Sequence, residues 1–156
     1  MRLHARRGPD IGGTSISPML KNQFGVLPYR TSDAGHIELM LITSRSTRRW
    51  VIPRGNPIGG LPPHLSAARE AYEEAGIIGH ISEDAIGSYK YLKRLKGGGM
   101  RPTQVHVFPL AFAMQLGEWA ESHQRDTRWF NLKKATTAVE ERGLRRLIRK
   151  FGESAR

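Results

Sequence analysis

The sequence predicts a mixed α/β sandwich built as one domain. Strand-like segments lie both before and after a central helical stretch, and a second helical stretch follows the last strand, an order typical of helices packed on a sheet. The length of 156 residues suits one hydrophobic core. We expect this domain to span residues 21–152. A flexible basic tail is expected over residues 1–20, which are rich in Gly, Ser, Pro and Arg and show no apolar period.

The longer strands are predicted from apolar alternation bounded by turn residues. Residues 24–30 and 36–44 should form a hairpin, because the turn residues "DAG" lie between them. Residues 88–95 and 104–114 should form two more strands around the turn "KGGG". These four segments supply the body of the expected sheet.

Shorter elements complete the fold. A short apolar strand is expected within residues 47–55, and another at residues 127–130. The last stretch, residues 133–151, should be mainly helical. Its predicted apolar stripe consists of Leu144, Leu147, Ile148 and Phe151.

Composition narrows the classes of function. The chain has no cysteine, which excludes disulfides, thiolate metal sites and a cysteine nucleophile. Its 25 basic and 14 acidic residues give a formal charge of +11, which favours polyanions such as nucleic acid, phosphorylated small molecules or anionic lipid. The sequence contains no membrane-length apolar run and no apolar leader. We therefore expect a cytoplasmic protein without a membrane partner.

The central helix has clear start and stop signals. Pro62 and Pro63 suit its first turn, where a missing N–H costs little. It should end near Ala75, because Gly76 favours the left-handed conformation that stops a helix. On a helical wheel, one face is apolar and is expected to pack on the sheet: Leu65, Ala68, Tyr72 and Ala75.

Three carboxylates, Glu70, Glu73 and Glu74, occupy the other side of this helix near its C-terminal end. They are expected to project away from the sheet together. One interpretation is an ordinary solvated acidic face. However, Glu70 and Glu74 repel each other at i, i+4, and acids in the last turn oppose the helix dipole. A divalent cation would replace this repulsion by ligation, and Mg²⁺ prefers such oxygen ligands.

The segment "GNPIGGLPPHLSAAREAYEEAGI" (55–77) resembles the signature of the Nudix hydrolases, G-x5-E-x7-R-E-U-x-E-E-x-G-U. The fixed positions that match are Gly55, Arg69, Glu70, Glu73, Glu74, Gly76 and Ile77. The flanking "WVIPRG" and "DTRWF" also agree, so the resemblance covers about residues 23–151. It is greatest to the branch of diphosphoinositol polyphosphate and diadenosine polyphosphate hydrolases. It implies a Nudix-type α/β/α sandwich with a mixed sheet.

Two positions depart from the pattern. Leu61 occupies the place of the first glutamate, and Ala71 that of a bulky aliphatic residue. In the family that glutamate pairs with the arginine corresponding to Arg69, which here must find another partner. The resemblance assigns Arg69 and Gly76 structural roles.

The resemblance implies water attack on phosphorus in a substrate with a diphosphate linkage, with Mg²⁺ or Mn²⁺ as cofactor. Glu70 and Glu74 would be the strongest metal ligands, Glu73 a third, and the Gly55 carbonyl a fourth. The general base varies within the family. Glu70 is the first candidate, followed by the acids of the turn "GEWAES", Glu118 and Glu121.

Basic and polar side chains are needed for the remaining phosphates. Arg45 matches an arginine that contacts polyphosphate in the resembling branch. Each of the other candidates, taken alone, is consistent with an ordinary surface residue. The candidates are Thr43, Arg45, Arg54, Lys93, Arg94 and Arg125.

Three functions are consistent with these observations. The first is a Mg²⁺-dependent pyrophosphohydrolase acting on a small polyphosphorylated molecule. The second is a non-catalytic sensor of a nucleotide or phosphorylated metabolite, which the intact acids disfavour. The third is RNA binding through the tail and the last helix, and an RNA 5′-end pyrophosphohydrolase would combine it with the first. RNA is the less favoured partner, because no readout motif is present. Neither the substrate nor the choice between monomer and dimer follows from the sequence.

Overall fold

The computed structural model describes residues 20–155. The predicted tail therefore lies almost wholly outside the described residues. The elements are, in chain order, β1 (Lys21–Thr31), β2 (Ile37–Thr43), β3 (Trp50–Val51), β4 (Arg54–Gly55), α1 (Pro63–Ala75), β5 (Ile77–Ile81), β6 (Gly87–Arg94), β7 (Met100–Gln115), β8 (Thr127–Asn131), α2 (Leu132–Ala138) and α3 (Arg142–Ser154). None of the described helices is long and apolar enough to cross a membrane.

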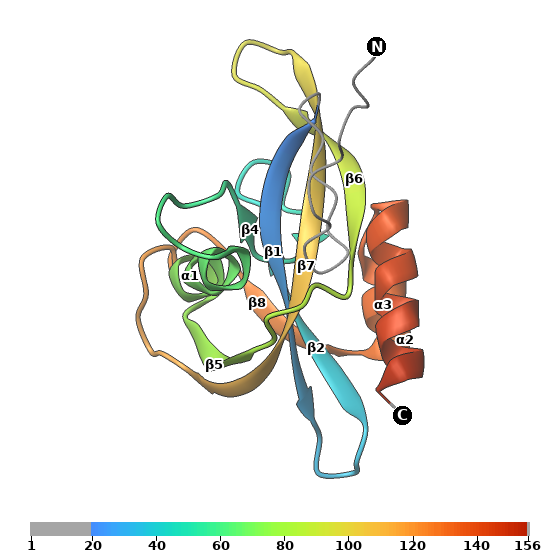
Figure 1. Ribbon diagram of the computed structural model, residues 1–156. Coiled ribbons are helices and arrows are strands. Elements are labelled where there is room, and N and C mark those ends of the chain that lie inside the picture. The colour runs from blue at the N-terminus through green and yellow to red at the C-terminus, as the bar shows by residue number, and fades with distance from the viewer. Residues whose placement is uncertain (1–19, 156) are drawn as a thin grey trace, which may run out of the picture.

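The strands form one mixed sheet with the order β3-β2-β1-β7-β5, to which β4, β6 and β8 add at β1, β7 and β2. The predicted β1–β2 and β6–β7 hairpins are antiparallel, as expected. The central pair β1–β7 is parallel and makes the sheet mixed. Helix α1 covers one face, and helices α2 and α3 cover the other (Figure 1). The α/β sandwich with a mixed sheet is thus confirmed.

Both faces of the central strands are buried. In β2, Leu39 and Leu41 belong to the core beneath α3, whereas Met40 and Ile42 belong to the core beneath α1. Because successive side chains of a strand point to opposite faces, an uninterrupted apolar run fits a strand covered on both sides. The predicted stripe of the last helix is also buried: Leu144, Leu147, Ile148 and Phe151.

The single strand expected within residues 47–55 is two strands, β3 paired with β2 and β4 paired with β1. Two further elements differ from the sequence prediction. Strand β5 was not predicted: its residues "IIGHI" contain a glycine and form a strand by pairing with the distant β7. The C-terminal stretch is two helices instead of one, because Val139 adopts an extended conformation and bridges to Trp50. In both cases a contact between residues far apart in sequence decides the local structure.

Helix α1 begins and ends where the sequence predicts, but it buries another face. Leu65 and Tyr72 are 42 % and 47 % exposed. The predicted Ala75 does pack against the sheet, together with the small residues Ala67 and Ala71, which let the helix approach closely. Glu74 lies beside them and is only 7 % exposed. The prediction that the carboxylates project away together is therefore wrong, and Glu74 points inward.

Gly76 ends α1 as predicted, with φ at 66° and its N–H bonded to the turn before it. A Cβ here would also overlap the ring of Trp119. We expect Gly76→Ala to lower the free energy of unfolding by about 2–4 kcal/mol, through backbone strain and displacement of the ring. Urea unfolding would measure this. Gly59→Ala is the matched control, because a Cβ at Gly59 meets nothing within 4 Å; a similar loss in both variants would contradict the prediction.

Candidate active site

Strand β4 brings Gly55 against the helix that carries the acids. Gly55 pairs with Phe24 of β1, which fixes its position at the sheet. A Cβ at Gly55 would overlap the carboxyl group of Glu70. Glycine is therefore required for the Glu70 carboxylate to lie against the β4 backbone, and the two residues form one wall of the site.

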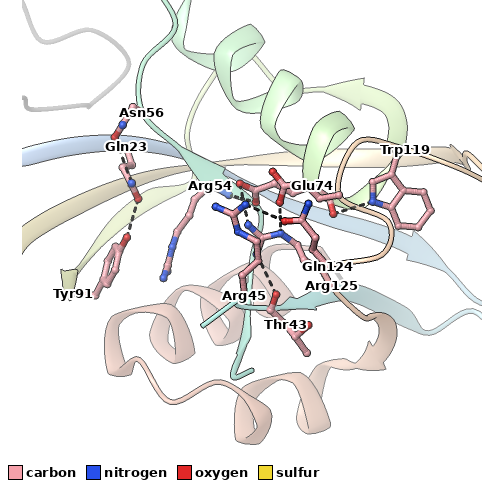
Figure 2. A network of polar contacts seen from close by, with 11 residues as sticks. Gln23, Thr43, Arg45, Arg54, Asn56, Glu74, Tyr91, Trp119, Gln124 and Arg125 are labelled. Atoms are coloured by element: carbon pink, nitrogen blue, oxygen red, sulfur yellow. Dashed lines mark hydrogen bonds and ion pairs between the residues drawn. The ribbon is translucent and has the colours of Figure 1, made fainter. Parts of the chain in front are cut away.

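Glu74 forms the floor of the site and has specific partners. Its Oε1 accepts a hydrogen bond from the backbone N–H of Arg54 at 3.2 Å. Its Oε2 lies 3.6 Å from Nη2 of Arg125. Figure 2 shows Glu74 at the end of α1, facing these two arginines. A carboxylate that is so nearly buried needs such partners, because an unpaired buried charge is costly.

The electrostatics of the two carboxylates favour protons or cations. Burial raises the pKa of Glu74 to about 8; Arg125 counteracts this shift and Glu70 adds to it. Burial and the neighbouring Glu73 raise the pKa of Glu70, while a hydrogen bond with Glu74 counteracts the rise. Two acids that share one partly dry space cannot both ionise cheaply. A bound divalent cation would relieve both penalties.

The loop 116–126 supplies the other charged groups. Arg125 Nε donates to Glu121 Oε1 at 2.6 Å, and its Nη1 donates to the carbonyl of Thr43 at 3.1 Å. The side chain of Arg125 is 9 % exposed. The Thr43 hydroxyl accepts from the backbone N–H of Asp126 at 2.9 Å. Thr43, Glu121 and Arg125 therefore lie together at the site, bonded to each other or to the loop backbone.

Trp119 anchors this loop and was missed by the sequence reasoning. Its Nε1 donates to the Glu74 carbonyl at 3.0 Å, and its ring lies against Gly76. The backbone N–H of Glu121 also donates to the carbonyl of Glu73 at 3.2 Å. The loop thus satisfies carbonyls at the end of α1, which have no partner within the helix. An aromatic residue inside the polar turn "GEWAES" was the only signal available.

The residues present fit a divalent cation in part. Glu70 and Glu74 lie together, and the Gly55 backbone leaves room that a side chain would fill. Within residues 20–155, no three His, Asp or Glu side chains converge as a complete ligand set. Two carboxylates completed by waters and substrate oxygens are the usual surroundings of Mg²⁺.

Arg54 points away from this pair and into a buried polar network. Its Nη1 donates to Tyr89 Oη at 2.7 Å and to Glu141 Oε1 at 2.9 Å. Its guanidinium lies 3.8 Å from the ring centroid of Tyr91. Tyr91 in turn donates to Gln23, which Figure 2 shows beside it. The Arg54 side chain is thus engaged within the protein, while its backbone N–H serves Glu74.

The ion pair with Glu141 anchors β4 to the start of α3 and was not foreseen. We expect Glu141→Ala to lower the free energy of unfolding by about 2–3 kcal/mol, because the guanidinium of Arg54 would stay buried without its counter-charge. Glu141→Gln keeps an acceptor and should cost about half as much. Chemical denaturation would compare both with Glu140→Ala, whose ion pair with Arg49 is exposed. Equal losses at positions 140 and 141 would refute this role.

The loop before α1 has an anchor that replaces the pair lost at Leu61. The buried Ser66 accepts a hydrogen bond from the N–H of Ile58 at 3.0 Å. Arg69 is exposed, and the described residues offer it no hydrogen bond or ion pair. The expectation that Arg69 finds another partner is therefore wrong, and a serine hydroxyl holds the loop.

The remaining predicted residues divide by location. Arg45 is exposed and donates to Gln124 Oε1 at 3.0 Å, beside the Arg125 loop (Figure 2). Oε1 of the exposed Glu118 lies 3.4 Å from Nε2 of His123. In the sheet register, Gly55 is level with Ser88 of β6. Lys93 and Arg94 lie five and six residues beyond Ser88 on the same strand. At ~3.4 Å per residue this is about 17 Å along the strand, so the structure does not bring them to the carboxylates.

Comparison with known proteins identifies the family of this chain. A family model described as NUDIX domain matches residues 19–151. "Nudix hydrolase 21, chloroplastic" of Arabidopsis thaliana is 29 % identical over 133 residues, which cover 81 % of this chain and 64 % of the relative. The matched part therefore spans just under two thirds of that relative.

Two further proteins are similar to this chain, one in sequence and one in fold. "Diphosphoinositol polyphosphate phosphohydrolase 3-alpha" of Mus musculus is 28 % identical over 122 residues, 77 % of this chain and 70 % of the relative. A crystal structure of a C. elegans Ap4A hydrolase binary complex has a TM-score of 0.64 at 23 % identity, and the match covers 87 % of this chain and 98 % of that one. The latter similarity establishes the shared fold.

Proposed function

Because this chain belongs to the Nudix family, we propose that it is a divalent-metal-dependent pyrophosphohydrolase that cleaves a phosphoanhydride bond by water attack. The observation that carries the proposal is the inward-facing pair Glu70 and Glu74, set against the Gly55 backbone. The fold itself does not require these acids to face inward, because solvated acids would be equally compatible with it. A cation site explains why acids of raised pKa are held where burial opposes their charge.

Glu70 and Glu74 are the residues that would hold Mg²⁺ or Mn²⁺, with the Gly55 carbonyl and Glu73 as further ligands. The cation would neutralise the charge of the transferring phosphate and help to orient it. Glu70 is assigned to water activation, because a half-buried carboxyl whose pKa is raised is a stronger base than a solvated one. Glu121 is the second candidate, and its carboxylate is held by Arg125.

Arg45 and Arg125 are assigned to the phosphates that are not attacked. Arg45 is exposed at the rim of the site, and among residues 20–155 its guanidinium bonds only Gln124. Arg125 lies deeper and is engaged with two acids, so it contributes its charge more than free hydrogen bonds. Arginine forks fit phosphate oxygens well. The other predicted phosphate ligands have a weaker claim. Arg54 is engaged by Tyr89 and Glu141, and the Thr43 hydroxyl accepts from the Asp126 N–H. Lys93 and Arg94 lie far along β6.

The proposed substrate class is a diphosphoinositol polyphosphate or a dinucleoside polyphosphate. The support is the net charge of +11 and the names of the relatives described above. We propose residues 21–152 as the catalytic domain and a cytoplasmic location; the names of relatives include chloroplastic and mitochondrial forms.

A panel of substrates would test this function. Phosphate and nucleotide release would be measured from diphosphoinositol polyphosphates, dinucleoside polyphosphates, nucleotide sugars and triphosphorylated RNA, with Mg²⁺ and with EDTA. We expect Mg²⁺-dependent turnover of one of the first two classes. Turnover of RNA alone would favour a 5′-end pyrophosphohydrolase.

A non-catalytic sensor is the alternative that one observation favours. Arg125 already neutralises Glu74 and Glu121 in part, as a built-in cation would do in a protein that binds without cleaving. No turnover of any substrate, combined with tight binding of one of them in calorimetry, would establish the sensor and refute the hydrolase.

A further inference from the structure

The β6–β7 hairpin carries exposed apolar side chains that the fold does not use. Leu92 is 59 % exposed and Met100 50 % exposed. Leu95, at the turn, is also exposed. The hairpin projects beyond the end of the rest of the sheet (Figure 1). Clustered exposed apolar residues on one projecting element mark a contact surface more often than single ones do.

The same hairpin is strongly basic. From residue 85 to residue 117 the chain contains no acid. Its five bases are Lys90, Lys93, Arg94, Lys96 and Arg101. Among residues 20–155, none of the five side chains has a hydrogen-bond or ion-pair partner. Their charges are therefore available to an external anion.

The arrangement of these side chains opposes the stability of the hairpin. Lys93 lies directly opposite Arg101 in the antiparallel register, and like charges in facing positions are destabilising. Arg94 faces Met100, and Leu92 faces Pro102, so one face of the hairpin combines exposed apolar groups with a base. Backbone bonds close the turn, from Leu95 N–H to the Gly99 carbonyl at 2.8 Å. The hairpin is anchored by core side chains such as Tyr89 and Val105, while the side chains from Arg94 to Pro102 are exposed at its tip.

We propose that this hairpin docks on an anionic lipid bilayer. The apolar tip would enter the interface between headgroups and acyl chains, and the bases around it would contact lipid phosphates and carboxylates. Charge complementarity favours an anionic partner, and the aliphatic and thioether tip favours lipid over nucleic acid, because strand-binding surfaces stack bases on aromatic rings. This revises the expectation that no membrane is a partner. Peripheral docking needs no membrane-spanning segment.

Docking at the hairpin would leave the candidate active site accessible. The register places Lys93 about 17 Å along the strand from the level of Gly55. The carboxylates of α1 would then remain in water above the bilayer, open to a soluble substrate. The proposal does not depend on the catalytic function, so either can fail without the other.

Co-sedimentation with lipid vesicles would test the proposal on the full chain. Vesicles of phosphatidylcholine alone would be compared with vesicles that also contain phosphatidylserine. We expect binding only to the anionic vesicles. Lys93→Gln/Arg94→Gln should weaken vesicle binding about twenty-five-fold, because each of the two lost bases contributes a factor of about five. The matched control Arg146→Gln/Arg149→Gln removes two exposed bases from α3 and should weaken it less than about threefold, since charges remote from the surface are screened.

The apolar tip distinguishes lipid from other polyanions. Leu92→Ser/Met100→Ser should weaken vesicle binding at least about tenfold, because the transfer of these side chains into the interface is lost. Leu65→Ser/Met114→Ser removes exposed apolar groups elsewhere and should leave binding unchanged. Thermal unfolding would show that all four variants are folded.

Two results would overturn the proposal. Binding to RNA that exceeds vesicle binding, and that Leu92→Ser/Met100→Ser does not change, would assign the hairpin to nucleic acid. Equal loss of vesicle binding in the hairpin and α3 charge variants would reduce the interaction to net charge alone.

Discussion

Glu74→Gln is expected to lower kcat by about 10³-fold or more on the substrate that the panel identifies. The substitution keeps the shape of the side chain and an acceptor for the Arg54 N–H but removes the charge that would hold the cation. A bound metal contributes several kcal/mol to transition-state stabilisation, and about 4 kcal/mol corresponds to 10³ in rate. Steady-state kinetics at saturating Mg²⁺ would measure the effect.

The same variant should be more stable than the native chain at pH 8 without metal. The folded-state pKa of Glu74 is raised to about 8 from an ordinary value of 4.5. Between these values the folded protein holds more protons than the unfolded one, so this contribution to stability falls as the pH rises from about 5 to about 8. Glu74→Gln has no such titration. We expect the free energy of unfolding of Glu74→Gln to exceed that of the native chain by on the order of 2 kcal/mol at pH 8 and by little at pH 5.

Mg²⁺ completes the test of Glu74. It should stabilise the native chain at pH 8 and stabilise Glu74→Gln much less, because ligand binding raises stability only where a site exists. Glu140→Gln, at an exposed position, is the control and should match the native chain in all three measurements. A Glu74→Gln variant that keeps native activity would refute the metal-site assignment.

Arg125→Met is the second substitution with a large expected effect. It removes the cation that lies between Glu74 and Glu121 and bonds the Thr43 carbonyl. Breaking such a buried arrangement from one side costs about 3–5 kcal/mol. We expect a loss near 3 kcal/mol at pH 8 without metal, measured by urea unfolding, together with a large fall in kcat as the loop 116–126 loses its anchor.

The loss should depend on pH with a definite sign. Without Arg125 the pKa of Glu74 would rise further, because the arginine is what counteracts its upward shift. At pH 5 the Glu74 carboxyl of the variant would stay protonated and need no counter-charge. The native Glu74 also keeps its proton well below pH 8, so the difference in stability between variant and native chain should be nearly constant from pH 5 to about 7 and grow as the pH rises through about 8. Mg²⁺ should restore part of the loss.

Arg45→Met separates the structural role from phosphate binding. Arg45 is exposed and donates to Gln124, so its loss should raise KM about tenfold with little change in stability. Arg125→Lys keeps the positive charge but loses the forked guanidinium. Its stability should lie between that of the native chain and that of Arg125→Met. If Arg125→Met raised KM alone, with unfolding unchanged at both pH values, Arg125 would be a substrate ligand and the anchoring role would be refuted.

Much of this fold could be predicted from local sequence. The ends of α1 follow from Pro63 and Gly76, since both residues act on their own backbone. The strands of the two hairpins follow from apolar runs and from the turns between them. The seven matching positions of the segment 55–77, together with its flanks, were enough to indicate the family.

Other features were decided only by the tertiary structure. The wheel ranked Leu65 and Tyr72 as core, yet small alanines pack on the sheet and turn Glu74 inward. Strand β5 depends on β7, and the anchoring of the loop 116–126 depends on Trp119 reaching the end of α1. Arg54 and Arg125 looked like free phosphate ligands, but each is engaged by a partner remote in sequence. Local patterns determine where a helix or strand begins and ends, because their energies lie within a few residues. Which face is buried, and which acid a given arginine meets, is set by packing between segments that the sequence does not place side by side.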